Sequence, residues 1–148
     1  MIIDAYFEIK SLYYLFSGGM RLMLSYPKTP AMALRAIGMH PKYAGYGYTV
    51  EILKITKNHP EYTYRLAKAV YPQIMEKFGC TRSALDRNIR FAIERTWENG
   101  NQVLLQQLFG AFGTNWIPTN TELISVLTDL VLHGSIDDLS ADPAAEAR

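Results

Sequence analysis

The chain of 148 residues has a single cysteine, Cys80. One thiol cannot form an internal disulfide bond, which excludes the disulfide-stapled class of secreted domains and favours a reducing, cytoplasmic location. The N-terminus also lacks the basic start and small-residue cleavage pattern of a secretory signal, because Asp4 and Glu8 lie there. Secretion is therefore not predicted.

Long apolar runs are missing. Residues 12–16 and 20–24 are apolar, but a Ser-Gly-Gly segment and Arg21 keep them far below the ~20 residues that a membrane-spanning helix needs. Hydrophobic residues make up 49% of the chain and charged residues 20%, which is typical of a globular domain. No membrane partner is expected.

Motifs for catalysis and metal binding are also lacking. The three histidines, His40, His59 and His133, show no metal-ligand spacing. No nucleophile elbow, phosphate-binding Walker loop or catalytic pair of carboxylates occurs. We therefore expect a protein that is not an enzyme and that binds neither a metal nor a cofactor.

The charges that are present are unevenly placed. The whole chain has a net charge of only +1, yet residues 28–98 contain 12 Lys and Arg against 6 Asp and Glu. From Asp129 onward there are 5 acidic residues and one Arg. The middle of the chain thus has the positive charge that a nucleic-acid-binding protein needs.

Helical periodicity, without a strand pattern or an internal repeat, predicts an all-α fold: a compact bundle of about six helices. Besides the segment described next, helices are expected at residues 31–37, 49–57, 62–70 and 101–109, and after a capping box from Thr119 to Glu122. Residues 40–48 are expected to form a loop. We assign residues 29–133 to one domain, 1–28 to an N-terminal arm of uncertain structure, and 134–148 to an acidic, disordered tail.

The segment 72–97 has the order of a helix-turn-helix. A short amphipathic stretch, PQIMEKF, is followed by Gly79-Cys80 and by the longer TRSALDRNIRFAIERTW. Thr81 or Ser83 is expected to cap this longer helix. Asn99-Gly100 is expected to end it, with the glycine in the left-handed conformation.

The longer helix has two faces. Its apolar stripe consists of Leu85, Ile89, Ala92, Ile93 and Thr96, and its opposite stripe of Ser83, Arg87, Arg90 and Glu94. An arginine can pair with guanine. An aspartate such as Asp86 can either accept from cytosine or hold an arginine in position. Arg65, Lys68 and Arg82 are candidates for phosphate contacts. The same charges also fit an ordinary surface helix, with pairs between Asp86 and Arg90 or between Arg87 and Glu94.

Several motifs occur together in residues 29–132: YP before the first helix, LDRNIRFAIE in the second, W-x-x-GN, LFG and PTN-x-E. In this combination the chain resembles the C-terminal DNA-binding effector domain of the sporulation master response regulator of endospore-forming Firmicutes. The resemblance implies an all-helical domain that binds a short double-stranded DNA box, often as a tandem pair or dimer. It also implies base reading by Ser83, Asp86, Arg87 and Arg90.

The resemblance also implies a protein partner, and three positions differ from the family pattern. Residues 101–109 resemble the segment that contacts the RNA polymerase sigma factor, which implies polymerase contacts for Asn101, Gln102 and Gln106. Asp86 replaces a usual glutamate, Ala84 a frequent arginine and Phe91 a frequent histidine, so the preferred DNA sequence can differ.

Residues 1–28 are too short for the family's receiver domain, so the chain is expected to be either an isolated effector domain or a fragment. The leading prediction is a regulator without a receiver. The alternative is a helical module that pairs with a full-length regulator or a polymerase subunit without reading DNA.

Overall fold

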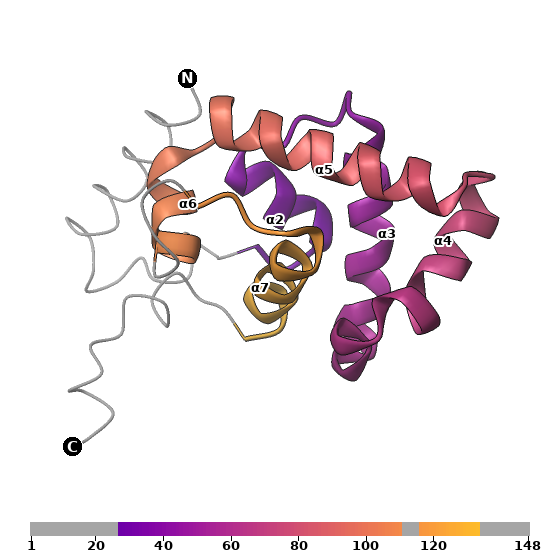
Figure 1. Ribbon diagram of the computed structural model, residues 1–148. Coiled ribbons are helices and arrows are strands. Elements are labelled where there is room, and N and C mark those ends of the chain that lie inside the picture. The colour runs from indigo at the N-terminus through magenta and orange to yellow at the C-terminus, as the bar shows by residue number, and fades with distance from the viewer. Residues whose placement is uncertain (1–26, 111–115, 134–148) are drawn as a thin grey trace, which may run out of the picture.

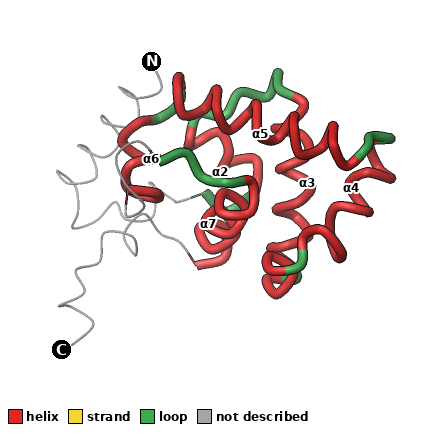
Figure 2. The backbone as a smooth tube through the Cα atoms, in the orientation of Figure 1, coloured by secondary structure: helices red, strands yellow, loops and turns green. Residues whose placement is uncertain are grey.

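The computed structural model describes residues 27–110 and 116–133, and these residues contain six α-helices and no strand (Figures 1 and 2). The helices are α2 (Pro30–Ile37), α3 (Ala44–Asn58), α4 (Tyr71–Phe78), α5 (Arg82–Asn99), α6 (Gln102–Phe109) and α7 (Asn120–His133). The predicted all-α bundle is confirmed. Most of the predicted N-terminal arm and the acidic tail lie outside the described residues.

Helix α5, with 18 residues, runs along one side of the bundle, with α4 at one end and α6 at the other (Figure 1). Helices α2, α3 and α7 pack beneath it and enclose the core. Fully buried core residues include Leu34, Ile37, Ile52, Leu53, Leu85, Ile89, Ile93, Leu123, Ile124 and Leu127. Each such side chain contributes roughly 1.5–3 kcal/mol through its removal from water. No helix among the described residues is long and apolar enough to cross a membrane.

Helix α2 covers the predicted residues 31–37 and one residue before them. The Thr29 hydroxyl accepts a hydrogen bond of 3.2 Å from the Met32 amide, and Pro30 occupies the first turn. Gly38 closes the helix in the left-handed conformation, with a φ of 88°. Local sequence is sufficient to define both ends of α2, because each capping residue bonds to a group within about one helical turn.

Helix α3 begins earlier than the sequence predicts. Residues 44–48, expected in a loop, form its first turn. A Cβ atom at Gly45 would lie only 2.8 Å from the Cβ of Ala92 and even closer to the Asn88 carbonyl oxygen. Gly45 therefore lets α3 approach α5 closely, and this tertiary packing outweighs the low helix propensity of the glycine-rich segment.

The helix predicted at residues 62–70 is replaced by two short turns. A 3₁₀ turn, η1 (Pro60–Tyr64), is followed by a π turn, η2 (Leu66–Val70), which leads directly into α4. The Tyr71 amide donates to the Leu66 carbonyl, as a π turn requires. Because Pro72 has no N–H to continue that ladder, a new helix starts at Tyr71, one residue before the predicted segment 72–97.

Gly100 ends α5, but in a different conformation from the predicted one. Its φ of −83° and ψ of −164° are extended rather than left-handed. A Cβ atom there would collide with the carbonyls of Thr96 and Ile37, so glycine is required by close packing. The next amide, that of Asn101, donates to the Ile37 carbonyl at 2.9 Å. The C-terminus of α2 is thereby fixed to the α5–α6 junction.

Only half of the predicted capping box forms at the start of α7. The Thr119 hydroxyl accepts from the Glu122 amide at 3.1 Å. The Glu122 carboxylate accepts instead from the indole N–H of Trp116, at 3.0 Å. The segment before α7 is therefore held by a side chain that lies outside the box.

Candidate nucleic-acid interface

Helices α4 and α5 are joined by a three-residue turn at residues 79–81. Gly79 adopts the left-handed conformation, with a φ of 63°, and its amide donates to the Met75 carbonyl. Thr81 caps α5, because its hydroxyl accepts from the Ala84 amide at 3.1 Å. The predicted helix-turn-helix order is present, and Thr81 rather than Ser83 is the cap.

The two predicted faces of α5 are confirmed. The apolar stripe is buried throughout: Leu85, Ile89, Ala92, Ile93 and Thr96 are each at most 2% exposed. Ser83 and Arg87 are exposed on the opposite side, and Asp86, Arg90 and Glu94 are partly exposed. Since the inner face is fully packed, the outer face has a fixed orientation.

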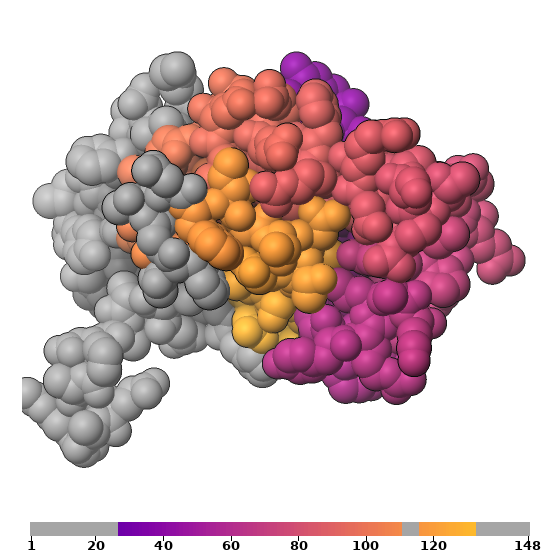
Figure 3. All heavy atoms as spheres, in the orientation of Figure 1, coloured from indigo at the N-terminus to yellow at the C-terminus, as the bar shows by residue number. Residues whose placement is uncertain are grey.

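This outer face lines an open groove that the start of α7 also lines. The residues around the groove are Tyr71, Arg82, Ser83, Asp86, Arg87, Arg90, Thr119, Asn120 and Thr121. The structure thus brings all four predicted base-reading residues together with Arg82. Figure 3 shows α5 and α7 next to each other on one face of the molecule.

Arg82 is held at the base of α5 by two contacts. Its Nε donates to the Asp86 carboxylate at 2.9 Å, and its guanidinium lies 4.4 Å from the centre of the Tyr71 ring. Burial raises the pKa of Tyr71 to about 12, with a further upward effect from Asp86 and an opposing one from Arg82. Asp86 therefore neutralises part of the positive charge near the helix start.

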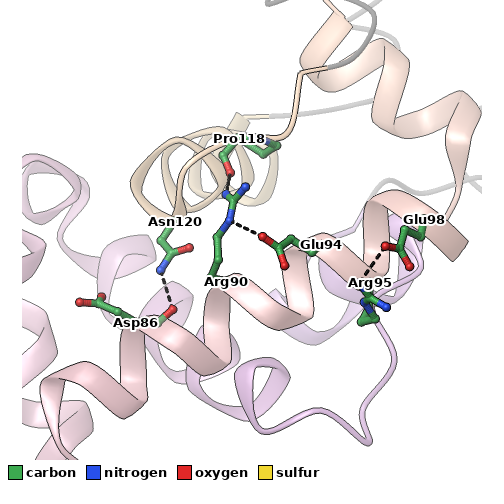
Figure 4. Close-up of polar contacts among 7 residues, drawn as sticks. All are labelled: Asp86, Arg90, Glu94, Arg95, Glu98, Pro118 and Asn120. Atoms are coloured by element: carbon green, nitrogen blue, oxygen red, sulfur yellow. Dashed lines mark hydrogen bonds and ion pairs between the residues drawn. The ribbon is translucent and has the colours of Figure 1, made fainter.

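Arg90 connects α5 to the segment before α7 (Figure 4). Its Nε donates to the Glu94 carboxylate at 3.0 Å, and its Nη1 donates to the Pro118 carbonyl at 2.6 Å. Beside it, the Asn120 side-chain amide donates to the backbone carbonyl of Asp86 at 3.1 Å. Two polar links thus fix the recognition face of α5 against residues 118–120.

Arg87 differs from the other two arginines of the groove. Within the described residues, the side chains of Arg87 and Ser83 make no hydrogen bond or ion pair. The pairs that do form, Arg82–Asp86 and Arg90–Glu94, have helical i,i+4 spacing. They replace the Asp86–Arg90 and Arg87–Glu94 pairs considered from the sequence, so among the three groove arginines Arg87 is the one whose guanidinium is not paired.

The remaining predicted phosphate contacts lie elsewhere. Arg65 stands between η1 and η2, and Lys68 lies within η2; both are exposed. Neither residue lines the groove. Both residues precede the start of α4 at Tyr71 along the chain, Arg65 by six positions and Lys68 by three.

The three predicted polymerase-contacting residues do not share one environment. Asn101 is only 1% exposed. Its Oδ1 accepts from the Leu104 amide at 3.1 Å, and its Nδ2 donates to the Ala36 carbonyl at 3.2 Å. Asn101 is therefore a helix cap that joins α6 to α2, and its buried side chain is not accessible to a polymerase. Gln102 and Gln106 are exposed on α6.

Sequence reasoning missed the contribution of α7 to the groove. The sequence predicts only that a helix starts near Thr119, Asn120 and Thr121. No local signal relates them to α5, although Asn120 binds the Asp86 carbonyl 34 positions earlier. The described residues include no group of His, Cys, Asp and Glu that could hold a metal ion. The polar groups that line the groove are guanidinium groups, hydroxyls, a side-chain amide and the Asp86 carboxylate.

The model of a known protein family, described as "Sporulation initiation factor Spo0A C terminal", matches residues 31–131. The chain belongs to this family. The match extends from the first turn of α2 to the last turns of α7, and so includes every groove residue. The family is that of a DNA-binding effector domain of a transcription regulator, which is a family of DNA-binding proteins rather than enzymes.

Proposed function

We propose that this chain is a sequence-specific DNA-binding transcription regulator whose α5 enters the major groove. The observation that carries the proposal is the exposed side chain of Arg87, without a partner in the described residues, on a helix whose opposite face is fully buried. A major groove of about 12 Å admits an α-helix, and base edges there carry a distinct hydrogen-bonding pattern. Membership of a DNA-binding family supports this proposal.

Among the four candidate base readers, Arg87 and Ser83 reach DNA without breaking any contact. Arg87 presents the fork that pairs with guanine, worth about 1–3 kcal/mol of discrimination. Asp86 can accept from cytosine only in competition with Arg82, and Arg90 must first leave Glu94 or Pro118. We therefore rank Arg87 and Ser83 as primary readers and Asp86 and Arg90 as readers that reorganise on binding.

Phosphate contacts come, in this proposal, from Arg82 beside the groove and from Arg65 and Lys68, which precede α4 along the chain. Such contacts give affinity and salt dependence but no sequence preference. All three side chains are exposed enough to reach a duplex.

Further partners are proposed from family membership. Exposed Gln102 and Gln106 on α6 would contact the RNA polymerase sigma factor, and two copies of the domain would pair on adjacent DNA boxes. A protein that binds DNA in this way would act in the cytoplasm. These assignments rest on the resemblance and on the exposure of both glutamines.

Selection from a pool of random duplexes with the purified chain tests the proposal. We expect enrichment of one short box, and the Arg87→Ala variant should fail to enrich it while remaining folded. An absence of enrichment at low salt would contradict sequence-specific binding. A stable complex with a full-length regulator in that case would favour the interaction module instead.

A further inference from the structure

A second group of cations lies on the flank of α5 opposite Arg90. The Tyr43 ring, in the connection between α2 and α3, meets the Phe91 ring edge-on, with centroids 5.5 Å apart. The Lys42 ammonium lies 5.2 Å from the centre of the Tyr43 ring, and the Arg95 guanidinium lies 5.3 Å from that of Phe91. We call these four residues, Lys42, Tyr43, Phe91 and Arg95, the cation–aromatic strip.

The strip is firmly positioned on α5. Its residues Lys42 and Tyr43 lie between two packed positions of the chain. Met39 is 1% exposed and belongs to the core, and Gly45 packs against Asn88 and Ala92 of α5. The Lys42 amide also donates to the His40 ring at 3.0 Å. The strip nevertheless faces solvent, since Phe91 is 48% exposed and Lys42 is exposed.

Helical geometry places this strip beside the proposed reading edge. Phe91 follows Arg87 by one turn, and Arg95 follows Phe91 by one more, so the three side chains share one side of α5. Figure 4 shows Arg90 directed toward the start of α7 and Arg95 directed to the other side of α5. The exposed edge of α5 is therefore bordered by cations on both flanks.

We propose that the cation–aromatic strip binds the sugar-phosphate backbone of one DNA strand while Arg82, on the other flank, binds that of the opposite strand. The inference rests on the proposed function. A helix in the major groove lies between two phosphate backbones, so cations on each flank are complementary to them. Residues 38–47 contain no acidic residue. The ion pair of 2.7 Å between Arg95 and Glu98 uses only one of the Arg95 nitrogens.

The aromatic rings have a defined part in this surface. A cation over a ring face is held in place by the ring quadrupole while its outer N–H groups stay available. Tyr43 therefore positions Lys42 without neutralising it. Phe91 likewise holds Arg95, although the charge of Arg95 is partly offset by Glu98. An acidic partner in place of a ring, such as Asp86 beside Arg82, would reduce the attraction for phosphate.

The salt dependence of DNA binding tests the inference. Binding of the full chain to the selected box and to a random duplex is measured between about 50 and 200 mM salt. We expect Lys42→Gln to lower the log–log salt slope by about 0.9 for both duplexes, so that the loss of affinity over this range becomes about threefold smaller. Lys42→Arg should restore the slope. Lys54→Gln is the matched control, since Lys54 is an exposed lysine of α3 paired with Glu51.

A strand-resolved measurement separates the two flanks. In ethylation interference, Lys42→Gln should remove signals on one strand and Arg82→Gln signals on the other. Equal slopes for Lys42→Gln, Lys54→Gln and the unmodified chain, or loss of signals on the same strand, would overturn the inference. If the chain binds DNA but selection enriches no box, only the proposed sequence-specific function is overturned. The salt slope on the random duplex then still tests the cation–aromatic strip. An absence of all DNA binding would overturn both.

Discussion

The Arg90 guanidinium donates a hydrogen bond of 2.6 Å to the backbone carbonyl of Pro118, which lies 28 residues further along the chain. Together with the bond from Asn120 to the Asp86 carbonyl, it joins the reading face of α5 to the segment that leads into α7. A residue expected to read bases thus also supports the fold in the unbound protein. Stability and DNA affinity should consequently respond differently to changes at Arg90 and at Arg87.

Replacing Arg90 with Ala should lower the free energy of unfolding by about 1 kcal/mol. This is less than the roughly 1.5–3 kcal/mol typical of charge-assisted hydrogen bonds, since the Arg90 side chain is 39% exposed to water. Urea titration measures the change. Arg87→Ala is the control and should stay within about 0.5 kcal/mol of the unmodified protein, because it removes no hydrogen bond or ion pair. Equal stabilities for both variants would show that the link to Pro118 contributes nothing.

Replacing Arg87 with Ala should weaken binding to the selected box by about 10- to 100-fold, the equivalent of one lost bidentate base contact. Binding to a random duplex should fall far less, since only a general attraction is lost there. Fluorescence anisotropy with both duplexes gives the ratio. A similar loss on the two duplexes would assign Arg87 to phosphate rather than to a base.

Replacing Gly45 with Ala should destabilise the fold by about 1–3 kcal/mol, because the added methyl group has no space between α3 and α5. Gly47→Ala, two residues further along the same helix, is the matched control. Nothing lies within 4 Å of a Cβ atom there, so alanine should stabilise the helix by roughly 0.5–1 kcal/mol. Thermal unfolding of the two variants compares them. Effects of the same sign would refute this account of the start of α3.

Stability should fall as the pH rises above 10. The unfolded chain ionises the Tyr71 phenol near pH 10, whereas burial holds the folded pKa at about 12. The unfolded state therefore loses this proton first, and stability present below pH 10 is lost as the pH rises through 12, on the order of 1–2 kcal/mol. Denaturant titrations at pH 8 to 11 should show a weaker decline for Tyr71→Phe. Tyr64→Phe, at a residue 87% exposed, should decline like the unmodified protein.

Much of the candidate site could be predicted from the sequence because it lies on one helix. The spacing of Leu85, Ile89 and Ile93 defines the buried face, and this places Ser83 and Arg87 on the surface whatever α5 packs against. Which outward side chains are already engaged could not be predicted. Asp86 pairs with Arg82 and Arg90 with Glu94, and helical spacing allows several such pairs without ranking them.

The sequence by itself determined the helical class, the helix-turn-helix order of α4 and α5 and the two faces of α5, and it limited the cap of α5 to Thr81 or Ser83. Each depends on residues within one or two turns of each other. Only the tertiary structure decided the start of α3, the burial of Asn101 and the contribution of α7 to the groove. These follow from contacts between residues 28 to 65 positions apart, as from Arg90 to Pro118 and from Asn101 to Ala36. Such contacts form only when the helices have packed, so the spacing of residues within one helix does not predict them.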